Sequence, residues 1–199
     1  MVFKDSISGQ YLYKRYVRTE TNKLYLEGFE EIMRRGISVQ SIICDGRKGL
    51  TKIFGSIPLQ MCQFHQVQII IRYLTKRPKS PAGRELNTLA RQLTKVNRDT
   101  FIYGMEQWIS DWGDYLKERS VSTITGKSFY THKRLRSAWL SLKRNLPWLF
   151  TCEEYRELMI PNTTNALDGA FADLKNKLRN HNGLSQARKV KYIDAYFKI

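Results

Sequence analysis

The amino-acid sequence predicts an α/β protein whose strands all lie in its first 79 residues. Two observations support this fold class. Short apolar stretches bounded by turn residues alternate with helical patterns up to Lys79, whereas beyond it apolar residues recur only at helical spacing. The chain has 199 residues, 42% of them hydrophobic, which is enough for one sizeable domain with a buried core.

The chain opens with a predicted β-hairpin. Residues 2–4 and 11–17 carry strand-forming side chains, and the turn-rich stretch 6–10 connects them. A helix then starts near Thr21 or Asn22 and ends at Gly36. Its buried face is predicted from apolar residues at helical spacing: Tyr25, Phe29 and Ile32.

The next elements alternate between strand and helix. Ile37 to Cys44 is predicted to be a central strand, and a second strand covers Leu59 to Cys62. A short helix lies between them, and His65 to Leu74 forms another after the second strand. The apolar residues of the short helix are Leu50, Ile53 and Phe54.

Residues 80–160 are predicted to be entirely helical. Ser80 and Pro81 cap the first of three helices. The second has an aromatic stripe that could stack bases, but its spacing is more typical of a buried face, which is the interpretation we adopt. The apolar residues of the three helices are Leu86, Leu89 and Leu93, then Phe101, Met105, Trp108, Trp112 and Tyr115, and finally Leu135, Trp139 and Leu142.

Residues 161–199 are predicted to form two more helices. The run Asn162-Thr163-Thr164-Asn165 is typical of a helix start and places Asp168 in the first turn. Ser185 is the expected cap of the last helix. The apolar residues of the two helices are Leu167, Phe171, Leu174 and Leu178, then Val190, Ile193 and Phe197.

The charge balance predicts a polyanionic partner. Lys and Arg number 34 against 18 Asp and Glu, a formal net charge of +16. Nucleic acid is favoured over a membrane as the partner because no segment is both basic and amphipathic. The alternative is that the excess of basic residues serves only the solubility of the protein. No transmembrane span is predicted. Three cysteines and the absence of a signal-peptide pattern predict a reduced, cytoplasmic protein.

Two carboxylates are candidates for metal-dependent phosphoryl chemistry. Asp45 ends a buried strand, and Asp168 lies at the start of a helix. Acids at such positions can together hold two divalent cations that activate a nucleophile and stabilise a leaving oxygen. The alternative is structural: Asp45 opens the turn at Gly46, and Asp168 complements the helix dipole.

Cys62 and His65 have the spacing of half a zinc site. Cys44 could approach them if the two strands are neighbours, but no second convincing pair lies nearby. We therefore expect a buried Cys62 and a His65 that hydrogen-bonds near the acids. A catalytic or substrate-contacting role for His65 is the second interpretation.

Taken together, these motifs resemble bacterial insertion-sequence transposases related to the Mutator-like group. The resemblance covers nearly the whole chain, and the order of its motifs is more specific than any one of them. Four strings carry it: Glu20-Thr21-Asn22 through Asp45-Gly46-Arg47-Lys48-Gly49-Leu50, Gln60-Met61-Cys62-Gln63-Phe64-His65-Gln66, Arg72 to Lys79, and Thr163-Thr164-Asn165-Ala166-Leu167-Asp168.

The resemblance implies a ribonuclease-H-like mixed sheet, formed by residues 1–79 and 161–199 and interrupted by an all-helical insertion at 80–160. In that family an Asp, Asp, Glu triad binds two Mg²⁺ or Mn²⁺ ions, cleaves transposon ends and transfers strands to target DNA. Asp45 matches the second acid and Asp168 the third. Cys62 and His65 match the following motif, with His65 in the catalytic group, and Asn165 belongs to the last motif.

Basic residues near both acids are the candidate DNA contacts. Seven Lys or Arg lie between Phe171 and Ile199, against Asp173 and Asp194. The residues we assign to DNA binding are Arg47, Lys48, Lys175, Lys177 and Arg179.

The sequence departs from the family pattern in two places. Only two strands fit before the first helix, where the family has three, so we expect a chain that lacks the first strand and the first acid and is inactive alone. Asp168 is also one methylene shorter than the usual Glu. The alternative function is a non-catalytic DNA-binding remnant that occupies transposon ends, or pairs with an intact copy, and so inhibits an intact transposase. A homo-oligomer is the other partner that we consider. We expect either form to be associated with the nucleoid.

Overall fold

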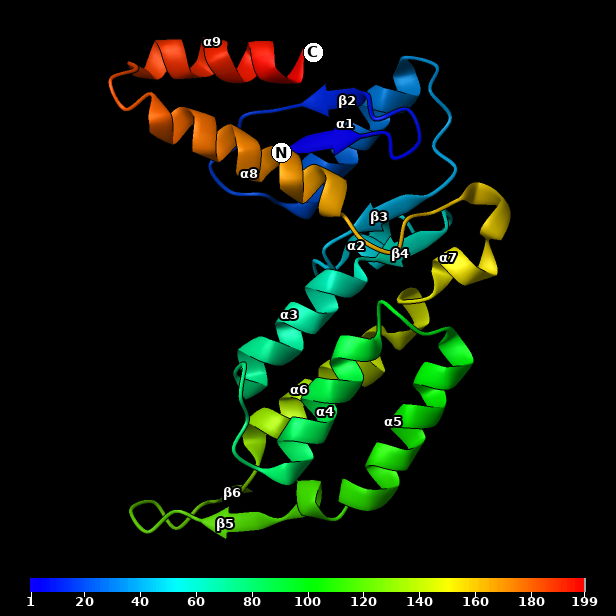
Figure 1. Ribbon diagram of the computed structural model, residues 1–199, viewed down its shortest axis with the longest axis vertical. Coiled ribbons are helices and arrows are strands. Elements are labelled where there is room, and N and C mark those ends of the chain that lie inside the picture. Colours follow the sequence, from blue (N-terminus) through cyan, green and yellow to red (C-terminus); the bar gives the residue numbers. More distant parts are fainter. Residues whose placement is uncertain (199) are drawn as a thin grey trace.

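The computed structural model describes residues 1–198 and confirms the α/β class. Figure 1 shows the order and placement of its elements. Those of the first 79 residues are β1 (Val2–Lys4), β2 (Tyr11–Lys14), α1 (Asn22–Arg34), β3 (Ile42–Cys44), α2 (Leu50–Ile53), β4 (Leu59–Met61) and α3 (Gln63–Leu74).

Helices dominate the remainder, with three short 3-10 turns at Tyr115–Lys117, Leu146–Trp148 and Arg156–Leu158. The other elements are α4 (Pro81–Gln92), α5 (Arg98–Trp112), β5 (Arg119–Val121), β6 (Ser128–Tyr130), α6 (Lys133–Asn145), α7 (Thr151–Glu154), α8 (Asn165–Asn180) and α9 (Gln186–Phe197). The predicted caps Thr21, Ser80 and Ser185 all accept a hydrogen bond from a backbone N–H of the helix that follows.

The strands pair two by two. β1 and β2 form the predicted antiparallel hairpin, and β3 and β4 run parallel with Ile42 opposite Leu59 and Cys44 opposite Met61. Within residues 1–198 these two pairs are separate sheets, so the single mixed sheet that the sequence predicted is not formed there. Only Ile42–Cys44 of the predicted strand 37–44 is a strand, because its partner β4 is itself three residues long.

The prediction of an all-helical segment at 80–160 is wrong in one place. β5 and β6 form an antiparallel hairpin between α5 and α6, with Val121 opposite Ser128. Gly126 adopts a positive φ of 63° in the turn, a conformation that glycine adopts at little cost. The hairpin escaped prediction because its strands are short and exposed and lack an apolar alternation.

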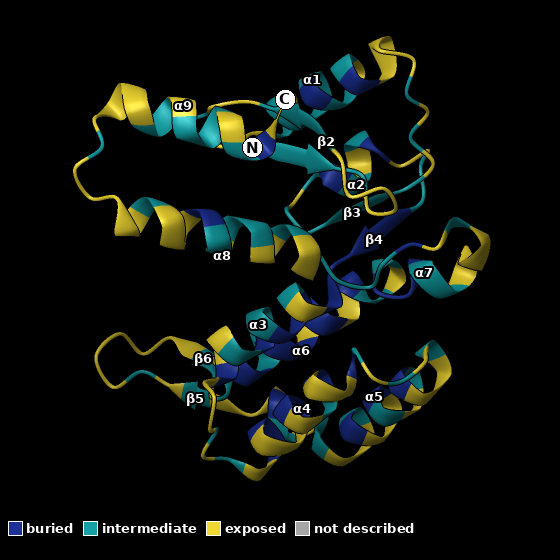
Figure 2. Cartoon of the chain, turned by 45° about the horizontal axis from the view of Figure 1, so that its top comes forward, coloured by how far each residue is buried: buried dark blue, intermediate teal, exposed yellow. Residues whose placement is uncertain are grey.

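The main core lies among α3, α4, α5 and α6, which we call the helical body. Its fully buried residues include Ile70, Leu86, Phe101 and Leu142. Trp108 of α5 stacks on Trp139 of α6 with ring centroids 4.9 Å apart, which confirms the core interpretation of the aromatic stripe. Figure 2 shows buried residues concentrated on the facing sides of these helices.

A second, thinner region contains β1, β2, α8 and α9, which we call the terminal layer. Every residue of β1 and β2 is only partly buried, and the buried residues of α8 and α9 are Leu174 and Phe197. Phe197 holds the layer together by packing edge-to-face on Tyr11 of β2 and Phe171 of α8. Between layer and body, a small cluster of Leu50, Phe54 and Leu59 is covered by α1.

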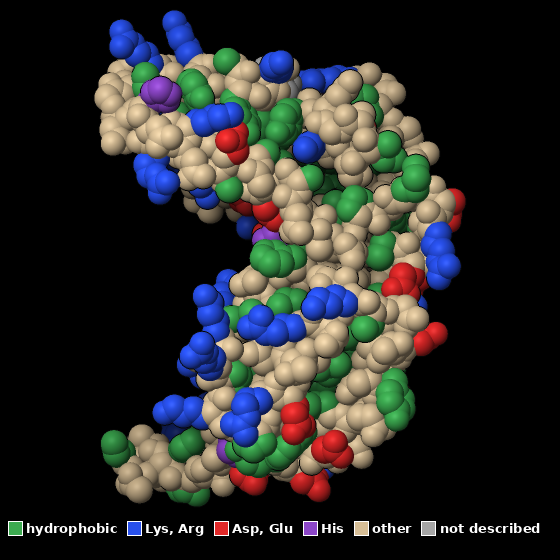
Figure 3. All heavy atoms as spheres, viewed as in Figure 1, with side chains coloured by type: hydrophobic (Ala, Val, Ile, Leu, Met, Phe, Trp, Pro, Cys, Tyr) green, Lys and Arg blue, Asp and Glu red, His purple; other side chains and the backbone are tan. Residues whose placement is uncertain are grey.

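The molecule is hollowed on one side, between the terminal layer and the helical body. α8 and α3 start close together near β4 and diverge toward this side (Figure 1). Figure 3 shows Lys and Arg side chains above and below the hollow, with acidic and histidine side chains at its deepest part. No helix among residues 1–198 is long and apolar enough to cross a bilayer.

Candidate active site where two helices begin

α3 and α8 begin side by side because their first residues are hydrogen-bonded to one another. The N–H of Gln63 donates to the carbonyl of Asn162 at 2.9 Å, and the Asn162 side-chain amide donates back to Oε1 of Gln63 at 3.0 Å. Cys62 is the cap residue of α3, and Thr164 is that of α8. The two sequence motifs therefore meet at the starts of two helices.

Thr164 connects Cys62, His65 and Asp168. Its N–H donates to the Cys62 Sγ at 3.2 Å, and its hydroxyl donates to Oδ2 of Asp168 at 2.8 Å. The same hydroxyl lies 3.3 Å from Nδ1 of His65 and 3.3 Å from the Cys62 Sγ. Cys62 is fully buried and His65 hydrogen-bonds next to the acid, as predicted.

The hydroxyl of Thr164 has a single proton, which fixes the direction of this network. Asp168 is the closest acceptor, at 2.8 Å, so it receives that proton. In the neutral tautomer that donates from Nδ1 to the Thr164 oxygen, the Nε2 of His65 is an acceptor. His65 is half-buried and Asp168 is exposed, so both side chains reach solvent.

Asp45 lies beside this network at the end of β3. The carbonyl of the preceding Cys44 accepts a hydrogen bond from the N–H of Cys62 at 2.7 Å. Oδ1 of Asp45 accepts from the N–H of Arg47 at 3.2 Å, which forms the predicted turn. Gly46 is required in this turn, because its φ is +81° and a Cβ would lie 2.4 Å from the Met61 methyl carbon.

The thiols next to the acids have different surroundings. Burial raises the pKa of Cys44 to about 11, so its sulfur stays protonated at neutral pH. Cys62 accepts a hydrogen bond from the backbone N–H of Thr164, which holds the start of α8 in place. Cys62 therefore contacts the helix that carries Asp168.

Arg47 and Lys48, predicted to contact DNA, lie in the loop between β3 and α2. The Arg47 guanidinium donates to the Asn22 side chain at 2.9 Å and to the Glu20 carbonyl at 2.6 Å. The Asn22 amide donates to the carbonyl of Lys48 at 3.0 Å. Arg47 thus ties the loop of Asp45 to the start of α1, a positioning role that the sequence did not indicate.

The basic residues of α8 divide between two faces. Lys175 and Arg179 follow Asp168 by about two and three helical turns, so they share its face. Lys177 lies about half a turn away, on the side of α9, where it pairs with Asp173 at 2.7 Å and stands over the Tyr196 ring. Lys175 and Arg179 therefore border the acid, whereas Lys177 does not.

Sequence reasoning missed two glutamines that fix the start of α3. The side-chain amides of Gln60 and Gln63 both donate to the Leu149 carbonyl at 2.8 Å, and both side chains are buried. Gln60 also accepts from the N–H of Cys152 at 2.9 Å. Asn165, which was predicted as a motif residue, is the exposed first residue of α8, and the contacts at this point are made by Thr164.

The two candidate acids are suitable ligands for a hard cation, but they are few. Asp45 and Asp168 offer carboxylate oxygens, the ligands that Mg²⁺ and Mn²⁺ prefer. Within residues 1–198, however, no group of three or more His, Cys, Asp or Glu side chains is arranged to hold a metal ion. Asp45 and Asp168 are therefore candidate ligands by their chemistry, and they are fewer than such a group requires.

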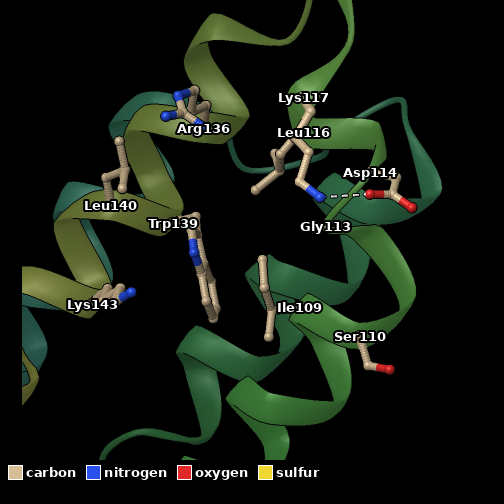
Figure 4. A pocket seen from close by; sticks show the side chains of 10 residues that line it. All are labelled: Ile109, Ser110, Gly113, Asp114, Leu116, Lys117, Arg136, Trp139, Leu140 and Lys143. Atoms are coloured by element: carbon tan, nitrogen blue, oxygen red, sulfur yellow. Dashed lines mark hydrogen bonds and ion pairs between the residues drawn. The ribbon is translucent and has the colours of Figure 1, made fainter.

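Two clefts of the helical body lie away from these residues. One of about 300 Å³ opens between α5 and α6, with Trp139, Arg136 and Lys143 on its α6 side (Figure 4). On its other side Lys117 donates to Asp114 at 2.7 Å. It contains no residue of the motifs.

Comparisons of the chain with protein-family models, with curated proteins and with solved structures found no match.

Proposed function

We propose that this chain is the catalytic region of a DNA transposase, in which Asp45 and Asp168 belong to a two-metal site for DNA end cleavage and strand transfer. The observation that carries the proposal is the network around Thr164. It joins Cys62 and His65 to Asp168, although the two motifs are about a hundred residues apart. Asp45 ends the strand beside them.

The surroundings of the acids suit a phosphodiester. The N-terminal ends of α3 and α8 meet at the network, and helix N-termini carry partial positive charge that favours phosphate. Lys175 and Arg179 extend this potential along α8, and Arg72 does so along α3, about two turns beyond His65. A DNA strand could therefore enter the hollow between the helices.

Each residue has a role in the proposed reaction. Asp45 and Asp168 would hold Mg²⁺ or Mn²⁺, which when bound activates the attacking oxygen and neutralises charge on the leaving oxygen. Thr164 orients the Asp168 carboxylate, and His65 presents the Nε2 acceptor toward solvent, where it can accept a proton from water or a DNA hydroxyl.

We also propose a ribonuclease-H-like arrangement for the strands and the helices that cover them. An antiparallel hairpin, then a helix, then a parallel strand pair with an acid at its end supports this assignment. α4, α5 and α6, with the β5–β6 hairpin, would be the insertion of that fold. In this arrangement the start of α8 returns to the neighbourhood of β3 and β4 (Figure 1).

Manganese binding tests the acid site without requiring turnover. Titration of the whole chain with Mn²⁺, followed by the loss of the free-ion electron paramagnetic resonance signal, should show binding that Asp45→Asn and Asp168→Asn each weaken. Asp111→Asn, an exposed acid on α5, is the matched control and should bind as the wild type does. Equal binding by all four proteins would refute the metal site.

The two faces of α8 provide a matched test of DNA binding. Lys175→Ala should reduce the dependence of log K on log salt by about 0.9, because one phosphate contact is lost. Lys177→Ala removes the same charge from the α9 side and should leave the slope unchanged. Equal slopes for both variants would remove the acid-bearing face of α8 from the DNA contact.

A second candidate is a DNA-binding protein without catalysis, which could inhibit an intact transposase by occupying its DNA or pairing with it. The observation that favours it is the net charge of +16, which supports DNA binding without any role for the acids. It predicts the same effect of Lys175→Ala but no Mn²⁺ binding that depends on the acids. The manganese titration therefore separates the two functions.

A further inference from the structure

The helical body carries a long stretch without acidic residues. Between Arg119 and Cys152 there is no Asp or Glu, and the seven basic residues are Arg119, Lys127, Lys133, Arg134, Arg136, Lys143 and Arg144. This stretch contains the β5–β6 hairpin and α6. None of its residues belongs to the motifs from which the function was proposed.

The hairpin projects from the body with basic and apolar groups in solvent. Ile124 at its turn is 93% exposed, Val121 is 65% exposed, and Lys127 beside them is exposed. At its base the guanidinium of Arg119 stands 4.7 Å from the Tyr130 ring centre, and Nζ of Lys133 stands 4.3 Å from that of Phe129. These stacking contacts hold the base of the hairpin and its cations in fixed positions.

The basic surface continues from the hairpin to the end of α3. Arg134 at the start of α6 donates to the carbonyl of Arg72 at 2.9 Å, so the two arginines are neighbours. Residues 46–84 also contain no acid and add Lys76, Arg77 and Lys79 after α3. In Figures 1 and 3 the hairpin forms the lower edge of the hollow, on the side where the candidate acids open.

The dimensions of these elements set the distance from the hairpin to the acids. From His65 to the end of α3 the rise is about 14 Å, and the hairpin arm from Thr131 to Ile124 adds at most about 23 Å. The two lengths add up to at most about 37 Å, which is close to one helical turn of B-DNA, or about ten base pairs. A duplex bound at the acids could therefore reach the hairpin one turn away.

We propose that the β5–β6 hairpin and the start of α6 form a second contact with duplex DNA, about one turn from the candidate acids. Lys127 and its basic neighbours contact phosphates, and the apolar tip at Ile124 enters a groove. This inference rests on the proposed function, since it places the same DNA along the hollow. Complementary charge favours DNA over a second copy of this equally basic chain.

Two variants of the hairpin test the contact on the whole chain. Fluorescence anisotropy with a duplex of about 24 base pairs should show that Lys127→Ala lowers the salt slope by about 0.9. Ile124→Ser should weaken binding at every salt concentration without changing the slope. Lys95→Ala, in the connection between α4 and α5 and away from the hollow, is the control and should behave as the wild type does.

Duplex length tests the spacing. A duplex of about 8 base pairs is too short to span both regions, whereas one of about 24 base pairs is long enough. The wild type should therefore gain more affinity with length than the double variant of Lys127→Ala and Ile124→Ser does. An equal gain for both proteins would overturn the inference.

The remaining outcomes separate this inference from the proposed function. If Lys175→Ala lowers the salt slope but the hairpin variants do not, only the second contact is refuted. If the chain binds no duplex at all, the proposed function fails together with it. If Ile124→Ser instead abolishes self-association in sedimentation velocity and leaves DNA binding unchanged, the hairpin is a contact between copies and the inference is overturned.

Discussion

The helical body and the terminal layer are built in different ways. In the body, four helices share one buried core in which residues such as Ile70, Leu86 and Leu142 are removed from solvent. In the terminal layer, α8 and α9 bury one residue each, and the strands of the hairpin are only partly covered. Apolar burial is the main source of stability, so the body should unfold later than the layer.

The difference matters because the candidate site draws on both regions. His65 belongs to the well-packed body, whereas Asp168 belongs to α8 in the thin layer. The two are joined mainly by Thr164 and by the hydrogen bonds between Gln63 and Asn162. The comparison therefore predicts that the site is lost before the fold is.

The largest effect is expected from Phe197→Ala. Removing this buried ring from Tyr11 and Phe171 should cost about 3–5 kcal/mol, which is enough to release the terminal layer. Hydrogen exchange measured by mass spectrometry should show lost protection in α8 and α9 while α3 to α6 remain protected. Simultaneous loss of protection in both regions would show that they form one cooperative unit.

Leu142→Ala makes the complementary change in the body. This fully buried leucine lies in the core of α6, and its truncation should lower the free energy of unfolding by about 2–5 kcal/mol. Urea unfolding followed by tryptophan fluorescence reports on the body, because Trp108 and Trp139 stack there. An unchanged midpoint would contradict the assignment of the main core.

Thr164→Val tests the residue that joins the helical body to the terminal layer. The change keeps the shape but removes the hydroxyl that orients Asp168, so Mn²⁺ affinity should fall about 10- to 100-fold. Thr163→Val, one residue earlier, makes the same replacement away from the network and is the control. Equal affinities for the two variants would refute an orienting role for Thr164.

The smallest effect on the terminal layer is expected from lowering the pH. Hydrogen bonds from Lys14 and Tyr16 lower the pKa of Asp194, and those from Lys177 and Tyr196 lower the pKa of Asp173. Because the folded pKa values lie below those of the unfolded chain, this contribution is present at neutral pH and is lost as the pH falls through them. Amide NMR signals of α9 should therefore move at low pH before those of the body, and Asp194→Asn should remove part of that change.

Local patterns predicted most of the helices, because caps and periodic apolar residues are local signals. Ser80 and Ser185 cap the helices that follow them, and the aromatic stripe of α5 is buried as its spacing indicated. The strands were harder to predict, since the length of β3 depends on a distant partner and the hairpin β5–β6 is short and exposed. Residues 37–41 could not be predicted to lie outside the strand from their own sequence, because the reason is that the partner strand β4 is too short to pair with them.

The candidate site was predicted only in part, because local motifs can be found in the sequence whereas contacts between distant residues cannot. The motifs named Cys62, His65 and Asp168, and the structure brings these three together. The hydroxyl that bridges them and the glutamines that fix α3 were missed, because their partners lie about a hundred residues away along the chain. Helical geometry alone places Lys175 and Lys177 on opposite faces of α8. The structure adds that the face of Lys177 is the one that α9 covers.

The separation of Cys62 and Thr164 by 102 residues has a consequence during synthesis. A ribosome adds about 5–20 residues per second, so the second motif follows the first after about 5–20 s. α4, α5 and α6 lie between the two motifs and can fold on the emerging chain during that interval, whereas Cys62 and Thr164 meet only afterwards. A nascent chain therefore carries the basic surface of the helical body for several seconds before Cys62 and Thr164 can meet.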